Sequence, residues 1–414
     1  MSLEQSPPAL DRADTRVRHD DGIGGAIRGF LDRMRSGDLG MVPVAVGVVI
    51  ISVVFTSLNP IFLAPNNLVN LLFDCATVGF IALGVVCVLM LGEIDLSIGS
   101  MSGLASAVFG TIWGTHGWPV GIAIACALMV GVAVGALYAV LHLRLGMPSF
   151  VATLAGLLAL LGLQLYLLGN AGSINLPYQS PMVRFGQILM IPEWLSYVLG
   201  LLPGLFTIVV GTGTIRRRRA ANLSAGGMGG VAFKAVILTA AILAAVYYLN
   251  LGRGVPWMFG AFIAVVMVME YAFTRTQWGR AMLAVGGNRE AARRAGIKVG
   301  RIYASAFILC SVFASLGGVL AASRLASSSQ QAGTGDVNLN AIAAAVIGGT
   351  SLFGGRGSAY SALLGVIVIQ LISNGLTLLS LSSSLRYMIT GAVLAIAVIV
   401  DSLARQTRAS HGRG

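Results

Sequence analysis

Charge is scarce in this sequence of 414 residues. Asp, Glu, Lys and Arg make up 10% of it, against roughly 25% in an ordinary soluble domain, whereas 56% of the chain is hydrophobic. A soluble globular protein cannot cover its surface with so few charges, and a disordered chain would be less apolar. Too little polar chain remains for the basic face of a nucleic-acid-binding domain. The net charge is nonetheless +12, so we expect a multi-pass membrane protein with positive loops.

Residues that usually carry catalytic or metal chemistry are also few. The only lysines, Lys234 and Lys298, do not occur as GK[ST], so a phosphate-binding loop is excluded, and neither HExxH nor GxSxG occurs. The cysteines lack metal-ligand spacing and fall within apolar runs, which favours a role as small core residues. They are Cys75, Cys87, Cys126 and Cys310. We therefore expect no catalytic residue, no metal and no cofactor bound by this chain.

The sequence is instead dominated by long apolar runs without charged residues. A helix needs about 20 apolar residues to cross the hydrocarbon core, whereas barrel strands would be about ten residues long with alternating polarity. We expect an all-α polytopic membrane helical bundle of about 10–12 transmembrane segments, in which 97–114 and 340–352 are short or interrupted. The expected segments are 42–62, 67–91, 97–114, 118–141, 149–169, 193–213, 231–250, 255–274, 302–323, 340–352, 359–379 and 385–403.

The basic residues predict the orientation of these segments. With a cytoplasmic N-terminus and alternating spans, nearly all of them fall on the cytoplasmic side, as the positive-inside rule requires. Both termini are then cytoplasmic. The outer side receives only Arg184, Arg253, Arg324 and Arg386.

The charged segments also divide the chain. Residues 1–41 form a tail with no secretory signal, either solvated or carrying a short amphipathic helix on the inner surface. A basic, Gly-rich linker at 214–230 separates a first transmembrane half, 42–213, from a second, 231–403; the alternative is a simple stop-transfer cluster. The C-terminal tail is 404–414.

Each half contains one polar, Gly-rich break, Leu91–Ser102 in the first and Ile347–Ser358 in the second. Paired without gaps, the two breaks match at two glycines, one leucine and one serine. Corresponding interruptions in two halves are typical of a transporter built from repeats.

Glycines spaced by four residues also occur within the spans. Gly131 and Gly135 form one such pair, and Gly200 and Gly204 another. This spacing lets helix backbones approach closely in lipid, so it predicts tight helix packing without indicating a cargo.

Placing an ionisable side chain at membrane depth costs free energy, so each such residue is expected to have a structural or functional role. Glu93 and Asp95 open the third segment, where they cap the helix or take part in a gate. Asp74 lies deeper, where it lines a polar path or pairs with a neighbour, and Glu270 is expected to form an ion pair with Arg275. The candidates for the translocation path or gate are Asp74, Glu93, Asp95, Ser97, Ser100, Asn340 and Asn374.

The basic cytoplasmic loop 275–301 gives the strongest signal. Asn288 can cap a short helix with Glu290 in its first turn, and Gly296 suits its C-terminal end. We favour a short projecting helix with Ala291 and Ala292 on its surface, against a solvated loop.

Several motifs resemble one family in the right order. Asn288–Ile297 resembles the coupling loop of sugar permease subunits in ABC importers, and Gly92–Met101 and Ala341–Gly357 resemble signatures of the ribose and xylose branch. Pro148–Gly156, Arg253–Pro256 and the added middle segments are similar to xylose-type members. The resemblance runs from about residue 43 to 403.

This resemblance implies a permease in the bacterial inner membrane that imports a monosaccharide, with a pentose such as xylose expected. It implies a second permease copy, cytoplasmic ATP-binding cassette ATPases that use the ATP, a periplasmic sugar-binding protein and surrounding membrane lipid. Movement of the ATPases would reach the bundle through the coupling helix. The residues that the resemblance places there are Asn288, Glu290, Ala291, Ala292, Gly296 and Ile297.

One position departs from the family pattern. Members usually have Glu-Leu-Asp before the Ala-rich run, whereas this chain has Asn338-Leu339-Asn340, with Asp336 upstream. Hydrogen bonding survives that change but charge does not, which puts receptor docking or gating at this outer position in doubt. Two other classes stay open: an ion-coupled secondary transporter of a small polar solute, using Asp74, Glu93 and Asp95, and a membrane-embedded enzyme.

Overall fold

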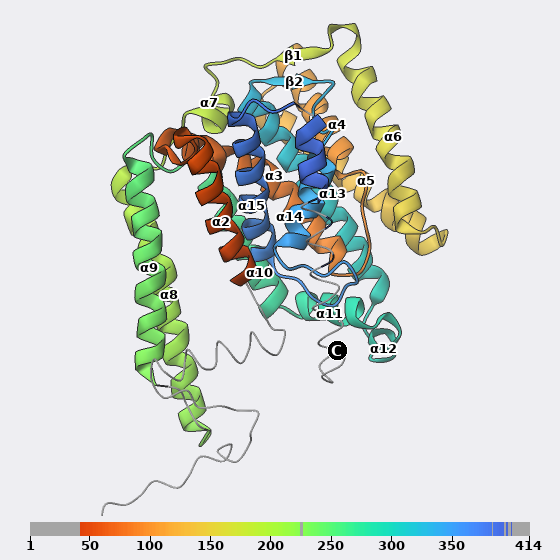
Figure 1. Cartoon of the computed structure of the whole chain (residues 1–414). Helices are drawn as coiled ribbons and strands as arrows, with labels where there is room; N and C mark the ends of the chain where they lie inside the picture. Colours follow the sequence, from red (N-terminus) through yellow and green to blue (C-terminus); the bar gives the residue numbers. More distant parts are fainter. Residues whose placement is uncertain (1–41, 224–226, 383, 393–394, 396–398, 400–414) are drawn as a thin grey trace, which may run out of the picture. The chain divides into compact units, whose positions relative to one another are not determined.

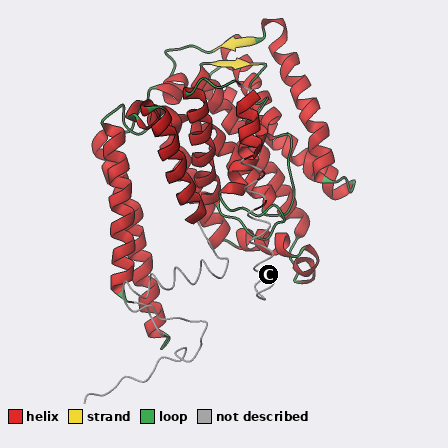
Figure 2. Cartoon of the chain, viewed as in Figure 1, coloured by secondary structure: helices red, strands yellow, loops and turns green. Residues whose placement is uncertain are grey.

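The computed structural model describes residues 42–223, 227–382, 384–392, 395 and 399. Figures 1 and 2 show helices throughout this part of the chain, with a single pair of short strands. The strands are β1 (Ser173–Asn175) and β2 (Ser327–Ser329). The α-helices are α2 (Val42–Leu58), α3 (Pro65–Leu89), α4 (Ile98–Phe109), α5 (Val120–Arg144), α6 (Ser149–Leu168), α7 (Pro181–Gln187), α8 (Glu193–Ala220), α9 (Met228–Asn250), α10 (Trp257–Arg275), α11 (Gln277–Gly287), α12 (Arg289–Arg294), α13 (Val299–Leu325), α14 (Val337–Ile347) and α15 (Ala359–Leu378).

Proline marks the start of many of these helices. It has no N–H to leave unpaired there, and its fixed φ suits a helix entry. It stands in the first turn of α3 and α7 and immediately before α5, α6, α8 and α10. The helix boundaries are therefore set by local sequence, and the apolar runs between them form the spans.

The expected all-α polytopic bundle is confirmed. Within the described residues, eight helices are long and apolar enough to cross a membrane, and α2 and α14 are shorter apolar helices. The expected segments 97–114 and 340–352 correspond to the short helices α4 and α14. The last expected segment, 385–403, is described only in part, and the tails 1–41 and 404–414 lie outside the described residues.

The larger of two units contains Gly40–Met190 and Pro256–Ser402. At its centre α13 packs against α3, α4 and α5, and α15 packs against α3 and α14. α3 is the most buried of the long helices. β1 and β2 pair antiparallel at one end of this unit, and α11 and α12 lie at the opposite end (Figure 1).

Ile191–Val255 belongs to the other unit, in which α8 and α9 form an antiparallel hairpin. α8 continues through Arg216–Arg219 and ends at Ala220, so the expected linker 214–230 begins as helix. The proposed boundary between two halves therefore lies inside this hairpin. Residues 224–226 of that linker lie outside the described residues.

The tight helix packing predicted at the spaced glycines is confirmed. A Cβ on Gly135 of α5 would lie 2.5 Å from the Cα of Ile308 and 2.6 Å from the carbonyl oxygen of Phe307, both on α13. A Cβ on Gly204 of α8 would overlap the side-chain oxygen of Thr239 on α9. Lipid provides no hydrophobic driving force between helices, so van der Waals packing at these small residues stabilises the bundle.

We predict that Gly135→Ala lowers the unfolding temperature of the detergent-solubilised protein. The added methyl group overpacks the contact between α5 and α13, at a cost of about 1–3 kcal/mol. Gly121→Ala is the matched control on the same helix, because a Cβ there meets no described atom within 4 Å. Equal unfolding temperatures for the two variants would contradict this packing.

Candidate functional site

The expected coupling loop folds into two helices, α11 and α12. The side-chain oxygen of Asn288 accepts a hydrogen bond from the Ala291 N–H at 2.9 Å, which caps α12. Glu290 lies in the first turn, and Gly296 follows the helix with a φ of +83°, a conformation that favours glycine. The predicted caps are confirmed.

The two alanines of α12 differ in burial. Ala291 is exposed, whereas Ala292 is only 4% exposed. The expectation that both lie on the surface is therefore wrong for Ala292, because a helix turns about 100° between successive residues and directs it toward the protein. Of the other coupling residues, Ile297 is half-buried; those that are exposed are Asn288, Glu290 and Gly296.

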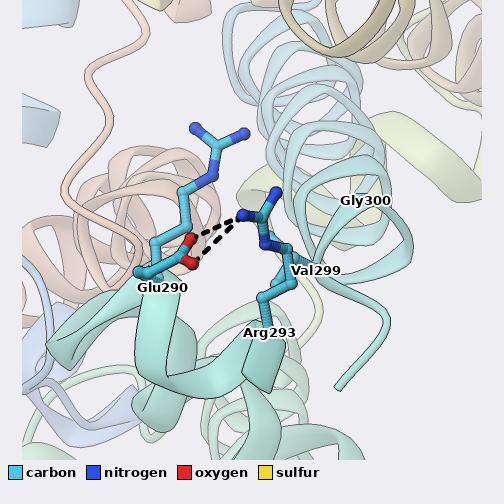
Figure 3. Close-up of a pocket in the computed structure, with 5 residues that line it drawn as sticks. Glu290, Arg293, Val299 and Gly300 are labelled. Atoms are coloured by element: carbon cyan, nitrogen blue, oxygen red, sulfur yellow. Dashed lines mark hydrogen bonds and ion pairs between the residues drawn. The ribbon is translucent and has the colours of Figure 1, made fainter. Parts of the chain in front are cut away.

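A shallow cavity of about 300 Å³ lies beside α12, lined by Arg289, Glu290, Arg293, Val299 and Gly300. Figure 3 shows the Glu290 carboxylate facing the Arg293 guanidinium, with a closest separation of 2.9 Å. Both side chains are mostly exposed, so the pair contributes little to stability. Its charges remain accessible to a partner.

A row of side chains links α12 to the break after α3. The Arg289 guanidinium lies 5.0 Å from the centre of the Tyr303 ring, and that ring stacks on His142 at 5.2 Å. His142 Nε2 lies 3.6 Å from the Glu93 carboxylate. The sequence singled out Glu93 but missed the other three, since they come from three separate helices.

Asp95 lies in the loop between α3 and α4 and is 2% exposed. Its carboxylate accepts hydrogen bonds from the N–H and hydroxyl of Ser97, at 2.8 and 2.7 Å, and faces the Cys310 thiol at 3.7 Å. Tyr138 donates to the Ser97 hydroxyl at 2.8 Å. Asp95 and Ser97 are therefore parts of one buried polar network.

The short helices α4 and α14 contact each other at the position that departs from the family pattern. The amide side chain of Asn338 on α14 accepts a hydrogen bond from the Gly99 N–H in the first turn of α4. Asn340 is buried and donates to Asp336 at 3.1 Å. Ser100 is buried on α4. An amide thus satisfies a helix N–H where a carboxylate was expected from the resemblance.

Two further candidates join helices in pairs. Asp74 on α3 accepts a hydrogen bond from Arg324 on α13 at 3.0 Å, and the arginine also stacks over Phe73. Asn374 on α15 exchanges amide hydrogen bonds with Asn67 on α3, at 2.8 and 3.0 Å. Asp74 therefore pairs with a neighbour, the second of its two expected environments.

Glu270 has a different role from the one expected. Its carboxylate accepts hydrogen bonds from the Ser358 hydroxyl at 2.7 Å and from the Ala359 N–H at 2.9 Å. It thereby caps the N-terminus of α15 from α10, where a negative charge suits the helix dipole. The expected partner was Arg275, whereas the observed partners are on α15. No local sequence pattern indicates this contact, because it joins two helices that are far apart in the chain.

In the described part of the chain, no group of three or more His, Cys, Asp or Glu side chains could hold a metal ion. The geometry instead joins the exposed short helix α12 to the break between α3 and α4. Such an arrangement suits the transmission of movement rather than a chemical reaction.

Comparison with known proteins agrees with this arrangement. Residues 67–398 match the family described as "Branched-chain amino acid transport system / permease component". The xylose transport system permease protein XylH of Escherichia coli (strain K12) is 33% identical over 380 residues, which cover 91% of this chain and 95% of the relative. The ribose import permease protein RbsC of the same organism is 30% identical over 362 residues, covering 86% and 92%.

A more distant relative points the same way. The XylH protein of Haemophilus influenzae is 29% identical over 377 residues, which cover 89% of this chain and 98% of the relative. No solved structure matches at a comparable level. The family match covers most of the chain, so this protein belongs to the permease components of that transport family and is not an enzyme.

Proposed function

We propose that this chain is the permease subunit of an ATP-driven ABC importer for a monosaccharide, with a pentose such as xylose as the cargo. It forms the alternating-access path in the bacterial inner membrane, with both termini in the cytoplasm. A cytoplasmic ATP-binding cassette ATPase supplies the energy, and a periplasmic sugar-binding protein delivers the sugar. A second copy of the chain completes the path within the lipid bilayer.

The connection between α12 and the break after α3 carries this proposal. α12 is capped, held by a buried Ala292 and otherwise exposed, as expected of an element that docks into another protein. The row from Arg289 to Glu93 connects that element to the break between α3 and α4. Two relatives are named for xylose and ribose transport, which supports a pentose.

Reconstitution tests the proposed function. The chain is placed in lipid vesicles with its candidate ATPase and sugar-binding protein, and uptake of labelled xylose is measured with and without ATP, with a hexose as the competing sugar. We expect uptake that requires ATP and both partners. Uptake driven by an ion gradient, by the chain alone and without ATP, would instead establish the ion-coupled alternative.

The side-chain contacts argue against ion coupling. Asp95 is buried with its oxygens engaged by Ser97 and Cys310, and Asp74 faces the Arg324 guanidinium. A coupling carboxylate must be free to exchange its ion with water on each side in turn. Asp95 is therefore enclosed in a structural network, and Asp74, whose side chain is 45% exposed, is engaged by the arginine.

A further inference from the structure

Three segments that are far apart in the sequence meet through their backbones at one end of the larger unit. The Gly355 N–H, in the loop between α14 and α15, donates a hydrogen bond to the Met90 carbonyl oxygen at the end of α3, at 3.0 Å. Gly286, in the last turn of α11, approaches the same carbonyl oxygen. We call Met90, Gly92, Gly286 and 353–355 the glycine junction.

The glycines leave little room for side chains at these contacts. A Cβ on Gly286 would overlap the Met90 carbonyl oxygen. A Cβ on Gly354 would lie 2.7 Å from the Gly286 carbonyl oxygen, and one on Gly92 would lie 3.3 Å from that of Phe353. Gly92 and Gly354 also have φ values of +78° and +80°, a region that L side chains rarely adopt.

Gly286 is the penultimate residue of α11, and its φ is not positive. A left-handed C-terminal cap, which favours glycine, therefore does not explain this residue. The close approach to Met90 does explain it. Because packed backbones yield little under load, movement of α11 passes to both neighbouring segments without a flexible side chain between them.

Those neighbouring segments lead into the two short helices. The break after α3 continues into α4, and the loop at 353–355 follows α14. The same junction thus joins the coupling segment to both Gly-rich breaks. The side-chain row of Arg289, Tyr303, His142 and Glu93 reaches the break after α3 but not the loop after α14.

We propose that the glycine junction is the joint through which movement of α11 and α12 displaces both interrupted helices together. Gly286 is its positioning residue, and a side chain there separates α11 from Met90. The proposal rests on the proposed function, because it needs an ATPase that moves the coupling segment. Beyond the proposed function, the proposal identifies the place in the fold where movement of the coupling segment reaches the translocation path.

Gly286→Ala is the direct test, with Gly287→Ala as the matched control. A Cβ on Gly287 meets no described atom within 4 Å, and the residue is exposed. In reconstituted vesicles we expect Gly286→Ala to keep ATPase association and basal ATP hydrolysis, while sugar uptake and the stimulation of hydrolysis by the loaded binding protein fall by at least about tenfold. Gly287→Ala should match wild type.

A second pair of variants, with a milder change, keeps the proposal testable if Gly286→Ala does not assemble with the ATPase. Gly92→Ala adds a Cβ that Phe353 can accommodate with a small shift, and Gly146→Ala is its control, since Gly146 has a similar φ of +67° and a Cβ there meets no described atom within 4 Å. We expect a partial loss of stimulated hydrolysis for Gly92→Ala alone.

The outcomes separate the two proposals. Wild-type protein without ATP-dependent uptake refutes the proposed function before any variant is compared. If wild type imports sugar and Gly286→Ala imports it equally well, the junction is not a joint. If Gly286→Ala and Gly92→Ala both fail to assemble with the ATPase, the glycines serve folding only and the inference is also overturned.

Discussion

Replacing Ala292 with aspartate is expected to abolish association with the partner ATPase. Ala292 is 4% exposed, and an unpaired carboxylate at a buried position costs several kcal/mol. α12 has only six residues and cannot persist alone, because isolated helices shorter than about 12 residues are marginal in water. Once Ala292 can no longer pack, the helix leaves its place and the docking element is lost.

Two measurements check this prediction. The amount of ATPase that co-purifies with Ala292→Asp should fall by more than about tenfold, equivalent to at least 1.4 kcal/mol of binding energy. Amide exchange across 289–297 should rise toward that of an unstructured segment, while exchange in α13 stays unchanged. Wild-type exchange together with wild-type co-purification would show that Ala292 does not anchor α12.

Ala291→Asp controls for the charge itself. Ala291 is exposed and follows the Asn288 cap, so an aspartate there lies near the N-terminal end of the helix dipole, where it is tolerated. We expect α12 to keep its slow amide exchange in this variant. A loss of ATPase association in Ala291→Asp would then show that the exposed face of α12 contacts the ATPase. A loss in Ala292→Asp would show that the ATPase needs α12 to be packed in its place.

The spans and caps were predictable because local sequence decides them. Hydropathy over about 20 residues identifies a span whatever it packs against, and eleven of the twelve expected segments coincide with long or short helices of the described residues. Asn288 and Gly296 predicted the two ends of α12, because helix capping depends on residues that are neighbours along the chain. The two Gly-rich breaks were found in the same way, as local interruptions of apolar runs.

Contacts between distant segments could not be predicted. His142, Tyr303 and Arg289 stand at the ends of different helices, and only the fold stacks them beside Glu93. The burial of Ala292 depends on which side of a six-residue helix faces the rest of the protein. The sequence marks Asn338 only as a departure from the family pattern, whereas its contact with Gly99 depends on α14 lying against α4. Periodicity carries no information about these pairings.

The boundary near residue 220 illustrates a related limit. The basic run Arg216–Arg219 marked a linker on charge alone, but charge does not stop a helix, and α8 continues through it. Orientation from the positive-inside rule depends on where such a run lies relative to the membrane, not on its secondary structure. The prediction of cytoplasmic charge is therefore unaffected by the correction.

Asp95→Ala is expected to have the second large effect, on folding. Its carboxylate accepts hydrogen bonds from the Ser97 N–H and hydroxyl, with the Cys310 thiol also facing it. Alanine leaves those donors buried without an acceptor, and each unsatisfied buried group costs about 1–3 kcal/mol. We expect little Asp95→Ala protein in the membrane fraction, and a much lower unfolding temperature for the protein that is recovered.

Asp95→Asn separates hydrogen bonding from charge. The asparagine keeps an oxygen that can accept from Ser97, and its amide is close in shape to the carboxylate. If Asp95 holds the network together, Asp95→Asn should fold and import sugar with ATP nearly as well as wild type. If Asp95 carries a coupling ion, Asp95→Asn should fold normally yet lose uptake, because the charge that binds the ion is gone. Uptake by this variant, measured beside its unfolding temperature, therefore decides between a structural acid and an ion-coupling acid at the entrance to α4.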